Sequence, residues 1–320
     1  MNTIDWLLDS DPTLRWQVEK DITNQPKDIW QVTKEQMLQV GFARRLLDHQ
    51  KNDGTWLHGA HVPKDFDWQG PQPWTATGWS LTQLREWGVT PEALLPDTAT
   101  LLKKLTWEYE DRPFWEGEVD VCINAYTLAN GAWLGLDMSH LLDWFEDHQL
   151  SDGGWNCDWI DGSKVASFHS TLNALIALLA YEEYTGSSDR SARMRQCGEE
   201  YLLDRRLMYQ KGTGKIHDWA LHLSYPFYFH YSVLRSLDYF RQAAQFEKKL
   251  PDERLEPAIN YLEQVRNPDG RWYTDYDKPG EVWFEIDSKA GEASRWLTFY
   301  ALRIQKWWKQ REIVERFLAF

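Results

Sequence analysis

Asp147-His148-Gln149-Leu150-Ser151-Asp152-Gly153-Gly154-Trp155 is the stretch that decides the fold, because the chain repeats it. An earlier copy, Asp48-His49-Gln50-Lys51-Asn52-Asp53-Gly54-Thr55-Trp56, shares the pattern D-H-Q-x-x-D-G-x-W. A third copy keeps Asp269-Gly270-Arg271-Trp272, with Gln264 two residues further upstream. A motif repeated at long intervals indicates an architecture built from one recurring supersecondary unit.

Each copy of the motif ends a helical pattern. Before Trp155, for example, Leu141, Leu142 and Phe145 are spaced to share one helix face. The Asp-Gly pair then predicts the end of the helix. A loop and a second, more apolar helical pattern follow each copy, so the sequence predicts a series of helical hairpins.

Two sets of helices make up these hairpins. The more apolar set is expected over residues 74–87, 121–136, 168–184, 227–240 and 293–308. The partner helices are expected over residues 34–50, 91–107, 139–149, 193–206 and 254–265, and residues 12–23 and 310–318 are expected to pair as a sixth hairpin. Six hairpins can close a ring with the apolar helices inside. No alternating β pattern or flexible linker interrupts the chain, which predicts one all-α domain over residues 1–320.

Composition and charge narrow the functional classes. The 320 residues are 42% hydrophobic and 26% charged, as in globular proteins. A net charge of -14 without a segregated basic face argues against nucleic-acid binding. No apolar run reaches the roughly 18 residues of a membrane span, so no transmembrane segment is expected. Three cysteines and the absence of a signal-peptide pattern predict a cytoplasmic protein.

The repeated motif carries a family resemblance. The form Q-x-x-x-G-x-W, as in Gln149, Gly153 and Trp155, resembles the QW repeat of squalene and oxidosqualene cyclases. The stretch Gly117-Glu118-Val119-Asp120-Val121 resembles a segment of protein prenyltransferase β subunits. Both families have an α/α toroid fold. The resemblance therefore implies an α/α toroid of about six helical hairpins whose central cavity binds an isoprenoid or other apolar substrate.

The 20 tryptophans fall into two groups. Those of the repeated motif, including Trp155, are interpreted as packing residues whose indole N–H finds a partner at the helix end. Others fall on the expected inner helices, where aromatic faces would line a substrate cavity and attract carbocations. The residues predicted to line this cavity are Trp74, Trp79, Trp133 and Trp296.

The resemblance to prenyltransferases also implies a zinc site. In that family an Asp-x-Cys pair and a later His bind zinc, which Asp120, Cys122 and His169 match here. Cys157 is a further predicted ligand, and oxygen, sulfur and nitrogen donors of these types suit zinc. Asp120, His169 and His230 are the candidate catalytic residues. By contrast, His58 and His61 lie in a loop without a nearby carboxylate or cysteine and are not expected to bind metal.

Alternative functions stay open because the match is incomplete. The chain lacks the D-x-D-D motif of the proton-donating cyclases, and the run from Glu108 to Asp111 is expected to be a solvated polar loop. A carbohydrate-active α/α barrel would use tryptophan faces to stack on sugars. Its paired carboxylates would be Asp65 with Asp67, or Asp275 with Asp277. A non-catalytic binding protein on the same fold is the third hypothesis.

Overall fold

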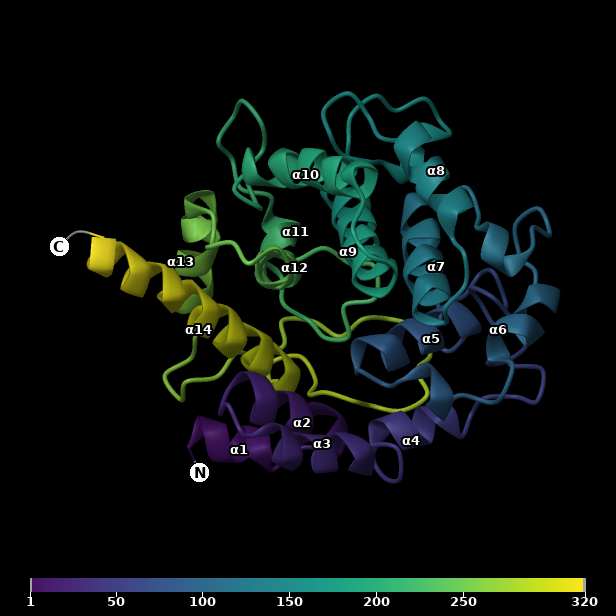
Figure 1. Ribbon diagram of the computed structural model, residues 1–320, viewed down its shortest axis with the longest axis horizontal. Helices are drawn as coiled ribbons and strands as arrows, with labels where there is room; N and C mark the ends of the chain where they lie inside the picture. Colours follow the sequence, from purple (N-terminus) through teal and green to yellow (C-terminus); the bar gives the residue numbers. More distant parts are fainter. Residues whose placement is uncertain (1, 319–320) are drawn as a thin grey trace. The chain divides into compact units, whose positions relative to one another are not determined.

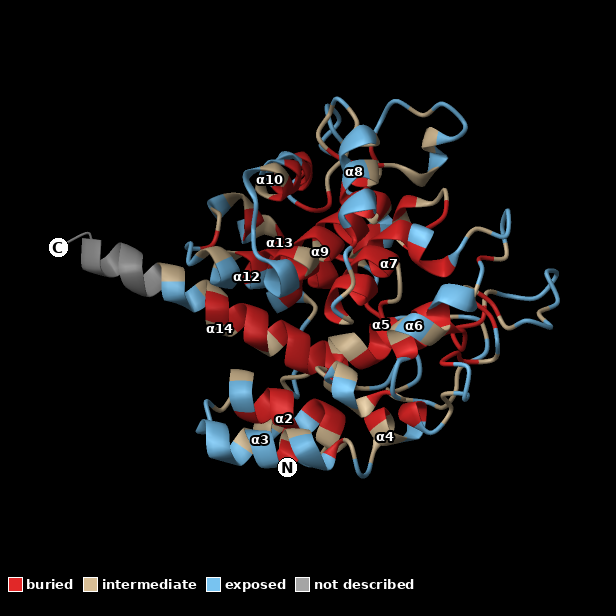
Figure 2. Ribbon diagram, turned by 45° about the vertical axis from the view of Figure 1, so that its right-hand side comes forward, coloured by how far each residue is buried: buried red, intermediate tan, exposed pale blue. Residues whose placement is uncertain are grey.

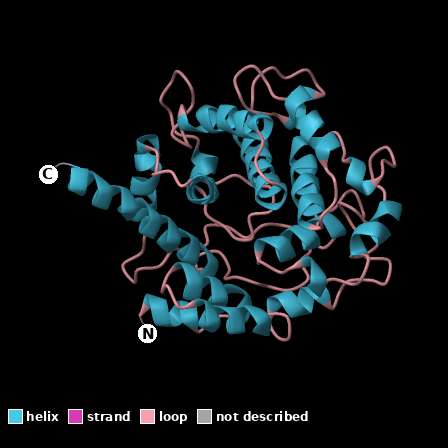
Figure 3. Ribbon diagram, in the orientation of Figure 1, coloured by secondary structure: helices cyan, strands magenta, loops and turns pink. Residues whose placement is uncertain are grey.

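The computed structural model describes residues 2–318 and is mostly helical, with 52% of residues in helices α1 to α14 and five short 3₁₀ turns. Across this range the chain forms isolated β-bridges but no strand, as Figure 3 shows. The all-α prediction is therefore confirmed. Within the same residues, no helix combines the length and the apolar character that a membrane crossing requires.

The backbone divides into two compact units. Unit 1 comprises Met1–Gly41, Leu202–Lys278 and Ile286–Phe320, and unit 2 comprises Phe42–Tyr201 and Pro279–Glu285. Because the two units are built from interleaved parts of the sequence, neither corresponds to one continuous half of the chain. The prediction of one domain over residues 1–320 stays a prediction.

Unit 2 is organised around α7 (Val121–Trp133). This helix packs against α9 (Phe168–Thr185) and α5 (Thr77–Glu86), and both α7 and α9 are buried along most of their length (Figures 1 and 2). The other helices of the unit are α4 (Phe42–Leu47), α6 (Thr98–Leu101), α8 (Ser139–Asp147) and α10 (Asp189–Leu203), with 3₁₀ turns at Pro91–Ala93, Leu102–Lys104, Phe114–Glu116 and Cys157–Trp159.

Unit 1 holds the two ends of the chain. Its long helix α14 (Arg295–Leu318) packs against α12 (Val233–Glu247) and α2 (Pro12–Asp21). The remaining helices are α1 (Thr3–Leu8), α3 (Lys27–Gln36), α11 (Asp218–Leu221) and α13 (Glu256–Gln264), with a 3₁₀ turn at Glu253–Leu255.

A buried ion network joins α12 and α14. Asp238 lies 2.5 Å from Arg303 and 2.8 Å from Arg241. Burial alone would raise the pKa of Asp238, but the two guanidinium groups hold it below its usual value. The network therefore keeps a carboxylate charged within the core of unit 1.

Four predicted helices differ from the structure. The helix expected over residues 227–240 begins only at Val233, where Ser232 caps it, and runs to Glu247. The helix expected over residues 34–50 is interrupted at Gly41, which has a φ of 95° and leaves no room for a side chain beside Asp11. Residues 91–107 form only short helical pieces, because Pro96 lacks an N–H and Asp97 adopts a φ of 62°. Residues 310–318 continue α14 instead of forming a separate partner helix.

All three copies of the repeated motif form what we call a tryptophan clip, in which a buried Trp joins the end of one helix to the next helix. The indole nitrogen donates to the carbonyl ten residues earlier, where the preceding helix ends. These pairs are Trp56–Leu46, Trp155–Phe145 and Trp272–Leu262, at 2.9, 2.8 and 2.9 Å. Each of these tryptophans is 0% exposed. The interpretation of these tryptophans as packing residues with a paired N–H is confirmed.

A threonine of the next helix completes each clip. Its hydroxyl accepts the backbone N–H of the Trp at 3.0–3.1 Å. In the second and third clips the hydroxyl also donates to the carbonyl of the same Trp, whereas in the first it donates to the Gly59 carbonyl at 2.6 Å. The pairs are Trp56 with Thr77 of α5, Trp155 with Thr171 of α9, and Trp272 with Thr298 of α14. The clip thus connects the two helices of a hairpin through one residue.

The structure of the third clip shows that the third copy of the motif aligns with the other two without the two-residue insertion assumed from the sequence. In every copy the backbone N–H of the residue five positions before the Trp donates to the backbone carbonyl of the residue just before the Trp. Asn267 and Arg271 form this bond at 2.9 Å, so the third copy has no insertion, and Arg266 occupies the position of the motif glutamine. In the complete copies this glutamine links its turn to another segment. Gln149 donates both to Gly153 and to Met194 of α10.

Candidate functional site

Two cysteines of unit 2 lie side by side at the start of α7. Cys122 is the second residue of α7, and Cys157 begins the 3₁₀ turn between α8 and α9. Their Sγ atoms are 3.5 Å apart, so the thiols share a hydrogen bond without being covalently joined. Both residues keep part of their surface exposed. We call these cysteines, with Asp120, Ser170 and Asn173, the thiol site.

Helix α9 contributes the polar side chains of the thiol site. The Ser170 hydroxyl accepts the backbone N–H of Cys157 at 3.0 Å and donates to its Sγ at 3.3 Å. The Asn173 amide donates to the Sγ of Cys122 at 3.4 Å. Ser167 caps the helix by accepting the N–H of Ser170, which fixes the first turn of α9 beside α7.

The two thiols have opposite pKa shifts. The hydrogen bond to Cys157, together with burial, raises the pKa of the Cys122 thiol well above its usual value. The same hydrogen bond, helped by the Ser170 hydroxyl, lowers the pKa of Cys157 in spite of burial. Cys157 is therefore the better nucleophile of the pair, because the thiolate is the reactive form of cysteine.

A carboxyl group adjoins the sulfurs. Asp120 precedes α7, and burial raises its pKa, although its hydrogen bond with Cys157 opposes the shift. Glu118 accepts the backbone N–H of Asp120 at 2.8 Å, and burial raises its pKa as well. The thiol site thus combines a nucleophile with a carboxyl group that holds its proton more tightly than a solvated one.

The structure brings together only part of the predicted metal site. Asp120, Cys122 and Cys157 are neighbours, and His169 lies next to Ser170 on α9, where its carbonyl accepts a hydrogen bond from the Asn173 amide at 2.8 Å. Among residues 2–318, however, no three His, Cys, Asp or Glu side chains are grouped in a way that could hold a metal ion. Zinc binding stays a prediction.

His230 belongs to unit 1, in the loop before α12. Its ring stacks on Phe229 with centroids 4.4 Å apart, and its carbonyl accepts a hydrogen bond from Arg235 at 3.1 Å. The candidate catalytic residues thus fall in both units, Asp120 and His169 in one and His230 in the other.

An aromatic cluster occupies unit 2 near the start of α5 and α7. Trp79 contacts Trp74 and Tyr126 with ring centroids 5.0 Å apart in each pair, and the His61 ring lies 5.1 Å from Trp79. The three aromatic side chains are buried. Gly78 permits this packing, because a Cβ there would lie 2.7 Å from the Tyr126 ring.

His61 anchors the aromatic cluster through both ring nitrogens. The side-chain amide nitrogen of Gln72 donates to the Pro73 carbonyl. The amide oxygen of Gln72 therefore faces His61 Nε2, at 2.9 Å. His61 must then carry its proton on Nε2 and accept the Tyr126 hydroxyl on Nδ1 at 2.9 Å. Burial of this neutral ring lowers the pKa of His61 to about 4. His58 instead bonds to the Asp53 carboxylate at 2.6 Å, so the expectation that no carboxylate lies nearby is wrong for this residue. His58 and His61 thus have different partners.

Glu108 is not a solvated loop residue. Its carboxylate accepts the backbone N–H groups of Ala60, His61 and Val62 at distances of 2.7–3.3 Å. This carboxylate therefore fixes the loop that carries His61. Sequence reasoning missed the role because the partners lie at least 46 positions away.

The four tryptophans predicted to line a cavity lie in different places. Trp74 and Trp79 belong to the aromatic cluster, whereas Trp133 ends α7, about 16 Å along the helix from Cys122 at ~1.5 Å per residue. Trp296 lies in unit 1, where it stacks on Tyr225 at 4.5 Å. All four are buried.

Three of the four carboxylates of the carbohydrate hypothesis accept backbone hydrogen bonds. Asp67 accepts the N–H of Gln69, Asp275 that of Leu223, and Asp277 that of Ala290. These bonds stabilise loops, and the four carboxylates, Asp65 included, are exposed. No observation at these residues favours a sugar-cleaving site.

Comparison with known proteins gives no family assignment. No protein-family model matches the chain, and no curated protein matches it. Among solved structures, a protein from Actinoplanes is similar at 17% sequence identity and a TM-score of 0.45, over 92% of this chain and 89% of that one. What this protein does is therefore inferred from its own residues.

Proposed function

We propose that this chain is an α/α-toroid protein of the kind represented by squalene cyclases and prenyltransferase β subunits, and that it binds an uncharged isoprenoid or similarly apolar molecule. The observation that carries the proposal is the tryptophan clip. It occurs three times with the same indole bond, at Trp56, Trp155 and Trp272, and each copy joins the two helices of a hairpin. Repetition of one hairpin unit is what a ring of hairpins requires.

The proposed binding region lies at the start of α5, α7 and α9 in unit 2. Cys122 and Tyr126 are four residues apart on α7 and so share one helix face. Burial raises the pKa of Tyr126 well above its usual value, and the charges of Glu108, Glu118, Cys122 and Asp120 add to the shift. The thiol site and the aromatic cluster are therefore adjacent along α7. An aromatic surface beside a small polar group suits an apolar chain that ends in a hydroxyl or an alkene.

The negative charge near the proposed binding region favours an uncharged ligand. Burial raises the pKa of Tyr126, and the carboxyl groups of Glu108, Glu118 and Asp120 are near enough to raise it further. A diphosphate head group would be repelled by these carboxyl groups. We therefore expect the isoprenoid alcohol or hydrocarbon to bind in preference to the diphosphate.

Thermal unfolding tests this expectation with matched ligands. Geranylgeraniol and squalene should raise the melting temperature, because a ligand that binds only the folded state adds about 2.7 kcal/mol of stability at 100 times its Kd. Geranylgeranyl diphosphate should raise it less. Stabilisation by oligosaccharides alone, or equal stabilisation by the alcohol and the diphosphate, would contradict the proposal.

Two tryptophan variants locate the binding region. Trp79→Leu removes the centre of the aromatic cluster and should abolish the shift caused by geranylgeraniol. Trp68→Leu is the matched control, because Trp68 is 69% exposed, and it should keep the shift. Metal analysis of the unmodified protein and of Cys122→Ser, both purified without chelator, tests the zinc prediction separately.

A further inference from the structure

The proposed isoprenoid ligand does not explain why two thiols are in contact. The Sγ atoms of Cys122 and Cys157 are 3.5 Å apart, and a disulfide needs about 2.05 Å, so an approach of roughly 1.5 Å would join them. Cys122 is held in the first turn of α7, whereas Cys157 lies in the loop between α8 and α9. We propose that Cys122 and Cys157 are a redox-active pair that closes to an intramolecular disulfide on reaction with a hydroperoxide.

The surroundings of Cys122 and Cys157 indicate that these thiols are reactive and are not inert buried residues. Both cysteines are partly exposed, which gives a small oxidant access to them. The Ser170 hydroxyl donates to the sulfur of Cys157 at 3.3 Å, and the Asn173 amide donates to that of Cys122 at 3.4 Å. Such donors stabilise negative charge on sulfur. Cys157, in the loop and beside a hydroxyl donor, is the thiol that reacts first.

The reaction balances in two steps. The Cys157 sulfur, having given its proton to solvent, attacks one oxygen of the hydroperoxide. The O–O bond breaks, the other oxygen leaves as an alcohol or as water after taking a proton, and Cys157 becomes a sulfenic acid. The Cys122 sulfur then attacks the sulfur of Cys157, the S–S bond forms as the S–O bond breaks, and the Cys122 proton passes to the departing hydroxide, which leaves as water. Two electrons pass from the thiol pair to the peroxide.

The disulfide and a zinc site exclude each other. A cysteine binds zinc as a thiolate, whereas a disulfide sulfur is uncharged and does not bind zinc in this way. Oxidation of Cys122 and Cys157 would therefore remove both sulfur donors of the predicted site. The oxidation experiment is performed with a chelator present, so its result does not depend on the zinc prediction or on the proposed isoprenoid ligand.

The chain supplies an internal control. Cys197 is exposed on α10, and it tests whether peroxide merely oxidises accessible thiols. The full-length reduced protein is treated with hydrogen peroxide, alkylated and digested for mass spectrometry. We expect a peptide containing Cys122 joined to one containing Cys157, reversal by dithiothreitol, and an alkylated Cys197. The variant Cys197→Ser should form the same bond.

Single variants test the order of reaction. In Cys122→Ser, a sulfenic acid on Cys157 has no partner and should be trapped by dimedone, whereas Cys157→Ser should give no adduct on Cys122. Ser170→Ala should slow disulfide formation severalfold without preventing it. Retention of three alkylated thiols after peroxide, or crosslinks that involve Cys197, would overturn the proposal. An adduct on Cys122 alone would overturn the assignment of Cys157 as the reacting thiol.

Discussion

The indole nitrogen of Trp155 donates to the carbonyl oxygen of Phe145 at 2.8 Å, and both residues are 0% exposed. This bond pairs a carbonyl at the end of α8 that the helix itself leaves unpaired. Because the Trp155 backbone also bonds to Thr171, one residue joins α8 to α9. The stability of a hairpin should therefore depend on this residue.

Trp155→Phe should be strongly destabilising. The change leaves the Phe145 carbonyl without its donor and opens a void where the indole was, which together cost about 2–4 kcal/mol. Urea unfolding monitored by circular dichroism measures the loss. Trp68→Phe, at a position 69% exposed, is the control and should change stability by less than about 0.5 kcal/mol. Equal effects of the two changes would argue against the clip.

Thr171→Val tests the second half of the same clip. Valine has nearly the same shape but cannot accept the backbone N–H of Trp155 or donate to its carbonyl. Because Thr171 is 0% exposed, water cannot replace the lost partner, and we expect a cost of about 1–3 kcal/mol. Thr185→Val at the exposed end of α9 is the matched control. A fully stable Thr171→Val protein would show that the hydroxyl is dispensable.

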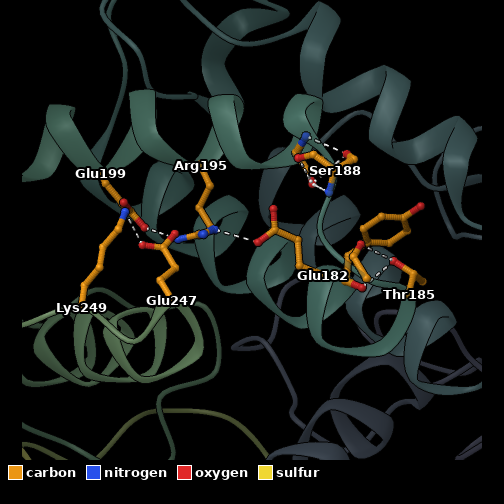
Figure 4. Close-up of polar contacts among 10 residues, drawn as sticks. Glu182, Thr185, Ser188, Arg195, Glu199, Glu247 and Lys249 are labelled. Atoms are coloured by element: carbon orange, nitrogen blue, oxygen red, sulfur yellow. Dashed lines mark hydrogen bonds and ion pairs between the residues drawn. The ribbon is translucent and has the colours of Figure 1, made fainter.

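Arg195 of α10 forms a buried ion pair, and we expect a single substitution in this pair to destabilise the protein strongly. It lies between Glu182 of α9 at 3.0 Å and Glu199 of its own helix at 2.6 Å (Figure 4). The side chains of Arg195 and Glu182 are 1% and 0% exposed. Arg195→Met leaves the Glu182 carboxylate buried without its countercharge, at a cost of about 3–5 kcal/mol.

The double variant Arg195→Met/Glu182→Met separates charge from packing. Removing both charges eliminates the uncompensated carboxylate, so the double variant should be more stable than Arg195→Met alone. Urea unfolding of the two variants and the unmodified protein makes the comparison. A double variant as unstable as the single one would mean that packing at Arg195, and not charge, is what α9 and α10 require.

Local signals made most of the helices predictable. The Asp-Gly pair before Trp155 predicts a turn at which the preceding helix ends. The apolar spacing of residues 121–136 and 168–184 predicts two helices, which correspond to α7 and α9. Two of the wrong predictions have one cause, because a single backbone position with positive φ, Gly41 or Asp97, interrupts the periodic pattern. Side-chain spacing does not reveal such a change of φ.

The candidate site was only partly predictable. Cys122 and Cys157 were recognised as chemistry-bearing residues, but their contact depends on how the loop before α9 packs on α7. Ser170 and Asn173 are not among the predicted site residues, although polar residues at i and i+3 share one face of a helix and could have pointed to them. The pairing of His61 with Tyr126 spans 65 positions, and no sequence pattern encodes it.

His61 should make unit 2 sensitive to acid. Its pKa is about 4 in the folded chain, where burial disfavours the charged ring, against an ordinary value of 6.5. Between these values the unfolded chain binds a proton that the folded chain does not, so stability falls as the pH falls, by at most about 1.4 kcal/mol per pH unit.

The variant His61→Asn removes this titration. Its unfolding free energy should change less than that of the unmodified protein between about pH 7 and about pH 5, where the linkage acts. Urea unfolding at the two pH values gives both slopes. His58→Asn, at a side chain 53% exposed, is the matched control and should keep the unmodified slope. If the unmodified protein and His61→Asn lose stability in parallel, the acid sensitivity originates elsewhere, and the bonds of His61 to Gln72 and Tyr126 do not hold the ring neutral.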